Sequence, residues 1–222
     1  MTRLRVLVVD DHPLVREGVI RVLDDEHDIR VVGWADSLDT ARRKLRELPV
    51  DVIVLDLALG PDDGMALLRE VQNGATQSVV VLTMFNQPMM AVRALQAGAA
   101  GYVLKEDPPE DTVVAVRKAS QGQIHITPRM ASEVIQRLAG RNPRSSGLDD
   151  LTDRELQIYR LLGEGHTVRD IATELEISAK TVESHRQNVI RKLGLSGSHE
   201  LLHHAIAWHL RHGHGAPGGA PA

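Results

Sequence analysis

The chain has 222 residues, of which 42% are hydrophobic and 25% are charged, with a formal net charge of −4 at pH 7. This length suits one or two globular domains, and the absence of cysteine excludes a disulfide scaffold, a thiolate metal site and a cysteine nucleophile. No apolar stretch approaches the roughly 20 residues that cross a bilayer, and the N-terminal segment is too short and too acidic for a signal peptide. We therefore expect a cytoplasmic protein without membrane contact.

The first half of the chain alternates the patterns of buried strands and amphipathic helices. Strands are predicted over residues 4–10, 29–35, 51–56, 78–84 and 101–105. Helices are predicted over residues 13–25, 37–48, 64–73, 88–97 and 108–121. Proline, serine and glycine stand at the expected helix ends. Five strand–helix units predict an α/β fold with a five-stranded parallel sheet and helices on both faces.

The second half of the chain has a different pattern. One more helix is predicted over residues 126–139, followed by a polar linker over 140–147. Four short helices are then predicted over residues 152–164, 168–175, 178–193 and 198–211. Residues 212–222 are rich in glycine, proline and alanine, and we expect disorder there. The predicted domains are therefore 1–125 and an all-α four-helix domain at 148–211, joined by a linker helix and flexible linker over 126–147.

Polar residues stand at the carboxyl ends of four predicted strands. They are Asp10, Asp11, Asp56, Thr83 and Lys105. Because parallel strands end at one edge of a sheet, we expect these side chains to lie together. Clustered carboxylates need a neutralising cation, and hard oxygen ligands favour Mg²⁺. A carboxylate, a hydroxyl and an ammonium beside Mg²⁺ form a site for phosphoryl transfer. Single acids at strand ends are often simple helix caps, but that explanation fits five ordered residues poorly.

Two sequence segments carry a family resemblance. Residues 9–16 (VDDHPLVR) and 98–105 (GAAGYVLK) resemble the matching segments of NarL/FixJ response regulators, and residues 1–125 are similar to their receiver domain. The resemblance implies a flavodoxin-like (βα)5 receiver in which Asp56 is the phospho-acceptor. It also implies that Mg²⁺ is bound by Asp11, Asp56 and the backbone carbonyl of Ala58, with Asp10 acting mainly through water.

The same resemblance implies roles for three residues near the acceptor. Thr83 and Lys105 would hold the phosphoryl group, and Tyr102 occupies the position of a switch aromatic. As a switch, the Tyr102 ring would swing inward when Thr83 moves to the phosphoryl group. A packed aromatic residue at the end of a strand is the plainer interpretation of Tyr102.

The loop after the acceptor departs from the family pattern. The family usually has a Met-Pro pair three and four residues after the acceptor, whereas this chain has Leu59 and Gly60 there, with proline at Pro61. Gly64 keeps its usual distance from Asp56. We expect an altered loop rather than a lost site.

The C-terminal pattern predicts a helix-turn-helix. Thr152 and Glu155 form a capping-box pattern, and Ser178 is placed to cap the helix 178–193. That helix has four cations, Lys180, Arg186, Arg191 and Lys192, against one acid, Glu183. A recognition helix needs cations for phosphates and short polar groups for base edges. The alternative is a generic packed helix with a solvated face.

Residues 151–195 closely resemble a LuxR-type helix-turn-helix DNA-binding domain. The resemblance implies that Glu183, Ser184 and Gln187 occupy base-reading positions. It implies that the DNA backbone is contacted by Lys180, Thr181, His185, Arg191 and Lys192. In this family the last helix serves as the dimer face, which here has Leu201, Leu202, Ala205, Ile206 and Trp208. Because residues 148–222 hold eight basic and ten acidic side chains, we expect weak, salt-dependent DNA binding by the monomer.

Histidines recur near the C-terminus. His199 and His203 are four residues apart, and His209, His212 and His214 follow. This spacing allows a metal site, but no carboxylate or cysteine partner has suitable spacing, so exposed histidines are the preferred interpretation. His12 lies near the acidic residues, and we interpret it as structural.

Together these patterns predict a transcription regulator of a two-component system. A sensor histidine kinase phosphorylates Asp56 with Mg²⁺, and the phosphorylated chain forms a homodimer that binds promoter DNA through the helix 178–193. Its only enzymatic activity is self-phosphorylation and autodephosphorylation of Asp56. One alternative is a DNA binder whose receiver does not switch, suggested by Leu59-Gly60-Pro61. Another is a Mg²⁺-dependent phosphatase, but Ala58 stands where its second catalytic acid is expected and the chain shows no cap domain.

Overall fold

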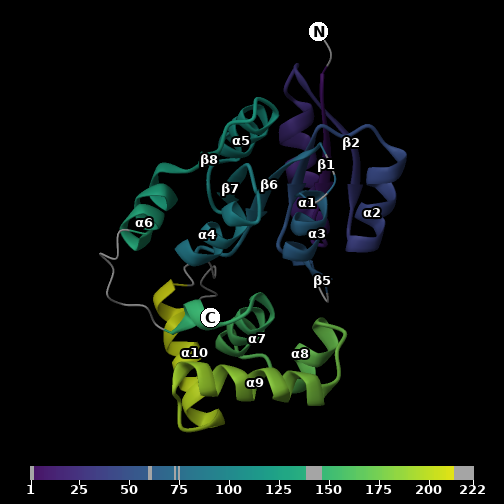
Figure 1. The fold of residues 1–222 in the computed structure, drawn as a ribbon. Coiled ribbons are helices and arrows are strands. Elements are labelled where there is room, and N and C mark those ends of the chain that lie inside the picture. The colour runs from purple at the N-terminus through teal and green to yellow at the C-terminus, as the bar shows by residue number, and fades with distance from the viewer. Residues whose placement is uncertain (1–2, 60–61, 73, 75, 139–146, 213–222) are drawn as a thin grey trace, which may run out of the picture. The chain divides into compact units, whose positions relative to one another are not determined.

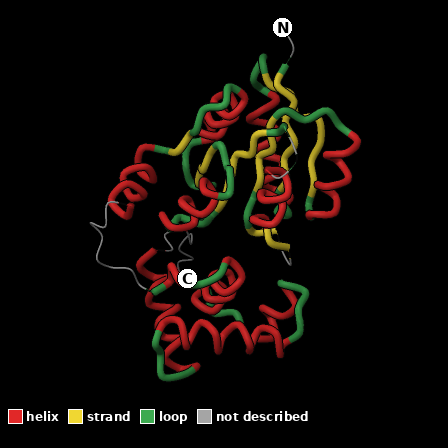
Figure 2. Tube along the Cα trace, in the orientation of Figure 1, coloured by secondary structure: helices red, strands yellow, loops and turns green. Residues whose placement is uncertain are grey.

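The computed structural model describes residues 3–59, 62–72, 74, 76–138 and 147–212. The strands are β1 (Leu4–Val9), β2 (Ile29–Ala35), β3 (Val52–Leu55), β4 (Ala58–Leu59), β5 (Asp62–Asp63), β6 (Ser78–Thr83), β7 (Gly101–Leu104) and β8 (His125–Ile126). The α-helices are α1 (Pro13–Asp24), α2 (Leu38–Glu47), α3 (Gly64–Gln72), α4 (Pro88–Gln96), α5 (Pro109–Ser120), α6 (Pro128–Leu138), α7 (Asp153–Gly163), α8 (Val168–Glu174), α9 (Ala179–Leu193) and α10 (Ser198–His212). The chain divides into two compact units, Met1–Pro143 and Arg144–Ala222, and Figure 2 shows that the strands belong to the first.

Six strands of the first unit form one sheet. Their order is β2-β1-β3-β6-β7-β8, and neighbouring strands are parallel (Figure 1). Successive residues of β1 point to opposite faces of the sheet, and both faces are covered. Val6 belongs to the core cluster that includes residues of α5, and its neighbour Leu7, outside that cluster, is also fully buried. The predicted parallel sheet with flanking helices is confirmed.

The sheet has one strand more than the sequence predicted. Residues 126–139 were expected to form a single helix, but His125 and Ile126 pair in parallel with Gly101 and Tyr102 as β8. The helix α6 begins at Pro128 instead, because a proline restricts the preceding residue to extended conformations and is well suited to a first helical turn. Helix α6 packs against α4 within the first unit.

The loop after Asp56 closes as a small antiparallel hairpin. In it β4 pairs with β5, with Ala58 opposite Asp63 and Leu59 opposite Asp62. The Gly64 N–H then donates to the Leu57 carbonyl at 3.2 Å, which brings the start of α3 back to the end of β3. Gly60 and Pro61, two residues of the unusual loop, lie outside the described residues.

Replacing Gly64 with alanine is expected to destabilise the first unit. A Cβ on Gly64 would lie 2.5 Å from the Asp56 carbonyl oxygen and 2.7 Å from Leu57 Cα, and both are backbone atoms that have little freedom to move. We expect a loss of about 1–3 kcal/mol in the free energy of unfolding, measured by urea denaturation.

The matched control for this substitution is Gly18→Ala in α1. A Cβ there meets nothing within 4 Å, so this variant is expected to be more stable by about 0.5–1 kcal/mol. Equal stabilities of the two variants would show that the close approach at Gly64 is not a constraint.

The second unit is helical, as predicted. Its four helices, α7 to α10, are preceded by a short 3₁₀ helix at Leu148–Asp150 that the sequence analysis did not predict. The predicted capping box is present, since Thr152 Oγ1 accepts from the Glu155 N–H and Glu155 Oε2 accepts from the Thr152 N–H. Helix α10 extends to His212, the first residue of the predicted tail.

Other predicted segments fall outside the described residues. Residue 139 of the expected helix, residues 140–146 of the expected polar linker and residues 213–222 of the expected tail lie there. The predicted domain boundaries therefore stay predictions. In the part of the chain that is described, no helix is long and apolar enough to cross a membrane.

Candidate phosphorylation site and nucleic-acid interface

An ion-paired trio occupies the carboxyl-terminal edge of the parallel sheet. Asp10 follows β1, Asp56 follows β3 and Lys105 follows β7. The Lys105 ammonium lies 2.7 Å from Asp10 Oδ2 and 2.6 Å from Asp56 Oδ2. All three side chains are at least nine-tenths buried. The convergence predicted from the strand ends is therefore present for these residues.

Burial and charge pairing act against each other at Asp56 and at Lys105. Desolvation raises the pKa of Asp56, and the nearby charge of Asp10 adds to this, while the Lys105 ammonium opposes it. Desolvation also disfavours the charge on Lys105, but Asp56 and Asp10 together hold the Lys105 pKa above its usual value. Asp56 Oδ1 accepts the Ala58 N–H at 3.1 Å. The Asp56 carboxylate is thus held by one ammonium and one backbone amide.

Asp11 and His12 extend the cluster toward solvent. His12 Nδ1 lies 2.7 Å from Asp11 Oδ1, and the His12 N–H donates to Asp10 Oδ1 at 2.8 Å. One ligand atom from each of Asp10, Asp11, His12 and Asp56 lies within 4.8 Å of the others. His12 was interpreted as structural, and its position directly after the two aspartates was the only signal in the sequence for this placement.

These residues fit a hard divalent cation. The three carboxylates lie close enough to share one ion, and carboxylate oxygens are the ligands that Mg²⁺ prefers. Lys105 supplies the positive charge between Asp10 and Asp56 in this structure. The described structure therefore brings Asp10, Asp11, Asp56 and Lys105 together at this edge of the sheet.

Thr83 and Tyr102 meet at the segment after β6. Thr83 Oγ1 accepts the Phe85 N–H at 3.4 Å, and the Tyr102 hydroxyl donates to the Phe85 carbonyl at 2.5 Å. Tyr102 is fully buried, and this burial, with the charge of Asp56, raises its pKa well above the usual value. The Tyr102 ring thus already occupies the inward position that the sequence analysis assigned to the phosphorylated state.

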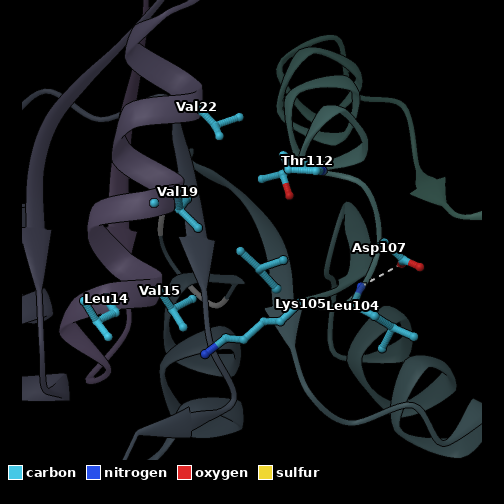
Figure 3. Close-up of a pocket in the computed structure, with 11 residues that line it drawn as sticks. Leu14, Val15, Val19, Val22, Leu104, Lys105, Asp107 and Thr112 are labelled. Atoms are coloured by element: carbon cyan, nitrogen blue, oxygen red, sulfur yellow. Dashed lines mark hydrogen bonds between the residues drawn. The ribbon is translucent and has the colours of Figure 1, made fainter. Parts of the chain in front are cut away.

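An apolar groove lies beside the acidic site, between α1 and α5. It has a volume of about 300 Å³, and Figure 3 shows Val15 and Val19 of α1 on one wall with the Lys105 side chain extending across its floor. Leu14, at the same end of α1, is 86% exposed. An apolar surface therefore adjoins the carboxylates.

Helix α9 has the features expected of a recognition helix. Ser178 Oγ accepts the Thr181 N–H at 3.0 Å at its start, and Gly194, with φ of +66°, ends it. Val182 and Val189 are fully buried on its inner side. The exposed residues among the predicted DNA contacts are Lys180, Thr181, Ser184, Gln187 and Arg191. Their spacing of three or four residues places most of them on one outer face of the helix.

Two predicted DNA contacts are ion-paired within the second unit, and a third is half-buried. Lys192 Nζ lies 2.6 Å from Glu155 Oε2, a carboxylate that is only 4% exposed. Glu183 pairs with Arg186 at 2.5 Å. His185 is half-buried, with its Nδ1 enclosed and without a hydrogen-bond partner, and desolvation lowers its pKa. The exposed face of α9 therefore includes fewer residues than the set of DNA contacts that the resemblance implied.

Comparison with known protein families agrees with both halves of the chain. A model of the response regulator receiver domain matches residues 6–117. A model of bacterial regulatory proteins of the luxR family matches residues 149–205.

Similar proteins align over nearly the whole length. The response regulator UvrY of Escherichia coli K12 is 35% identical over 95% of this chain and 95% of its own. The response regulator GacA of Pseudomonas aeruginosa is 35% identical over 95% of this chain and 97% of its own. The oxygen regulatory protein NreC of Staphylococcus epidermidis is 31% identical over 91% and 97% of the two chains.

Solved structures of RcsB from Salmonella are also similar. One, described by its conformational dynamism for DNA interaction, matches with a TM-score of 0.66 and 28% identity over 93% of this chain and 98% of its own. Another is RcsB bound to a promoter in the presence of the phosphomimetic BeF₃⁻, with a TM-score of 0.66 and 27% identity over 93% and 100% of the two chains.

The fold, the acidic site and the helix-turn-helix together define a DNA-binding response regulator. The chain belongs to the NarL/FixJ-type response regulators, which join a receiver domain to a LuxR-type DNA-binding domain. The predicted family and fold class are confirmed.

Proposed function

We propose that Asp56 accepts a phosphoryl group from a sensor histidine kinase, and that this phosphorylation controls the binding of promoter DNA through α9. The observation that carries the proposal is the buried bridge in which Lys105 Nζ lies within 2.7 Å of both Asp10 and Asp56. An ammonium in this position neutralises the acceptor carboxylate before transfer and is available for a phosphoryl oxygen afterwards.

The proposed transfer uses the residues of this edge of the sheet. An Asp56 carboxylate oxygen attacks the phosphorus atom of a phosphohistidine, so that a P–O bond forms while the P–N bond breaks and the leaving imidazole takes up a proton. Lys105 then turns its ammonium to a phosphoryl oxygen, and the Thr83 hydroxyl donates to another. Mg²⁺ held by Asp11, Asp56 and the Ala58 carbonyl, with Asp10 acting through water, would neutralise the crowded oxygens. No other enzymatic activity is proposed.

The kinase must approach the edge of the sheet that holds Asp56. The exposed Leu14 and the adjoining groove give the kinase an apolar surface there.

We propose that phosphorylation favours a homodimer, because two copies of α9 match a two-fold promoter site. Such a regulator works in the cytoplasm, where the DNA is. The proposed domains are the receiver at 1–125, the linker at 126–147 and the DNA-binding domain at 148–211.

The proposed DNA interface is the exposed face of α9. Ser184 and Gln187 are placed to reach base edges, while Lys180, Thr181 and Arg191 are placed to contact phosphates.

A second candidate is a DNA-binding regulator whose receiver does not switch. The inward position of Tyr102, with its hydroxyl on the Phe85 carbonyl, favours this candidate because the proposed change at Tyr102 has then already taken place.

Molar mass in solution distinguishes the two candidates. It is measured by light scattering with Mg²⁺, before and after addition of beryllofluoride, which mimics a phosphoryl group on Asp56. A monomer that becomes a dimer supports the proposed switch. Beryllofluoride bound at Asp56 without a change in mass would contradict the proposed coupling, and the absence of binding would contradict the assignment of the acceptor.

A further inference from the structure

Helix α10 has two different sides. The inner side is buried in the second unit through Leu201, Ala205 and Trp208, and the Trp208 ring packs edge-on against Tyr159 at 5.7 Å. The outer side exposes three large apolar side chains, Leu202, Ile206 and Leu210, by 36–70%. Three of the five apolar residues that were expected to form a dimer face therefore belong to the domain core. The apolar surface that remains exposed on α10 consists of Leu202, Ile206 and Leu210.

Two histidines lie on this outer side. His199 and His203 are both exposed, and a spacing of four residues places them on the same face of the helix as Ile206. Their ring centroids are 4.5 Å apart with an angle of 56° between the ring planes. Imidazole nitrogens bind Zn²⁺ at about 2.0–2.1 Å, so two rings that share one ion must bring their ligating nitrogens within about 4.2 Å of each other, which rings with centroids this close can do. Two histidines four apart on one helix face form this kind of chelate in zinc enzymes.

The pair supplies only half of a zinc site. Zn²⁺ in a closed site takes four ligands in a tetrahedral arrangement. Glu200, the carboxylate on the same helical turn, directs its Oε2 to the Ser196 N–H at 2.6 Å. Two further ligands must therefore come from outside this helix, and a two-fold axis beside α10 supplies a second pair of the same kind.

We propose that His199 and His203 bind a borderline divalent transition metal such as Zn²⁺, and that the same two histidines of a second copy complete the site. The exposed Leu202, Ile206 and Leu210 give the second copy an apolar surface to cover, so the metal and the apolar stripe favour the same assembly. No carboxylate or cysteine in the sequence has a spacing that would complete the site within one chain, whereas two-fold symmetry doubles the number of histidine ligands.

This site differs in chemistry from the acidic site of the receiver. The acidic site has three carboxylates beside a single imidazole, His12, and carboxylate oxygens suit Mg²⁺, whereas the paired imidazole nitrogens of α10 suit Zn²⁺, Cu²⁺ and Ni²⁺. Excess Mg²⁺ therefore occupies the carboxylates while Zn²⁺ is titrated. The proposal does not depend on phosphorylation, so its failure would leave the assignment of Asp56 untouched.

The test is sedimentation of the full-length chain with excess Mg²⁺ and no phosphoryl donor, as Zn²⁺ is added. We expect Zn²⁺ to lower the dimer dissociation constant by about tenfold or more, because an ion that binds only the dimer stabilises it by mass action. Calorimetric titration of the same samples is expected to give one ion for each two chains.

Variants separate this pair from other histidines. The double variant His199→Gln, His203→Gln is expected to lose the effect of Zn²⁺, and since both side chains are exposed, its fold is expected to persist. The control is His27→Gln, which removes a 91% exposed histidine of the receiver and is expected to respond like the wild type. An equal response of the double variant and the wild type would overturn the proposal, and so would one ion for each chain with an unchanged mass.

Discussion

Replacing Asp56 with asparagine is expected to abolish covalent phosphorylation of the chain. An amide oxygen is a far weaker nucleophile than a carboxylate, and among the described residues Asp56 alone contacts both Lys105 and the Ala58 N–H. The measurement is incorporation of labelled phosphoryl groups from acetyl phosphate in the presence of Mg²⁺. We expect the Asp56→Asn variant to show only background labelling while the wild type is labelled.

The fold of this variant is expected to persist. Burial raises the pKa of Asp56, so a neutral amide relieves a desolvated charge, and Lys105 keeps its partner Asp10. The control is Asp39→Asn on α2, which makes the same change in charge at a side chain that is 94% exposed and is expected to be labelled like the wild type. Persistent labelling of Asp56→Asn would assign the acceptor to another side chain.

Replacing Lys192 with alanine is expected to destabilise the second unit. The Lys192 ammonium neutralises Glu155, whose carboxylate is only 4% exposed. Burial alone would raise the pKa of Glu155, but hydrogen bonds from Lys192 and from Thr152 hold the pKa below its usual value. Because Lys192 is itself a quarter exposed, we expect a loss of about 1–3 kcal/mol rather than the larger cost of breaking a fully buried pair.

The neighbouring Arg191 provides the matched control. The Arg191 side chain is exposed, and within the described residues its hydrogen bond is to Asn188 Oδ1 at 3.1 Å. We therefore expect Arg191→Ala to leave the free energy of unfolding unchanged. The Arg191→Ala variant is expected to bind DNA more weakly. Its plot of log affinity against log salt concentration is expected to have a slope smaller by about one, which corresponds to the loss of one phosphate contact. The free energy of unfolding is measured by urea denaturation, followed by the fluorescence of Trp208 in variants that also have Trp34→Phe. DNA affinity is measured with a DNA fragment that the wild type has selected.

A second substitution tests the electrostatic cause. Glu155→Gln keeps a side chain that suits the capping box but removes the buried charge. Combined with Lys192→Ala, it is expected to recover part of the lost stability, as measured by a double-mutant cycle. If Lys192→Ala left stability unchanged and lowered the salt dependence as Arg191→Ala does, Lys192 would be a phosphate contact after all.

Local sequence rules predicted most of the fold and the centre of the acidic site. The strand ends of a parallel sheet meet at one edge, so the placement of Asp10, Asp56 and Lys105 followed once the strands were located. The starts of α2 and α7 followed from the capping preferences of Ser37 and Thr152. Such predictions succeed because their physical cause acts over only a few residues.

Other features had no such local cause. The strand β8 forms because His125 and Ile126 find a free edge at β7, and a strand of two residues leaves no periodic pattern in the sequence. The same holds for His12, whose place in the cluster depends on the turn that follows β1.

The amino-acid order alone was enough to establish the fold class, the family and the meeting of Asp10, Asp56 and Lys105, because hydrophobic period, caps and strand ends act locally and combine in few ways. The tertiary structure decided which polar side chains of α9 pair with the domain interior and which face solvent. Lys192 and Arg191 are adjacent cations on one helix, yet Lys192 reaches a buried carboxylate 37 residues away while Arg191 faces solvent. The difference comes from the packing of α9 on α7, which places one face of α9 in the interior and leaves the other face exposed.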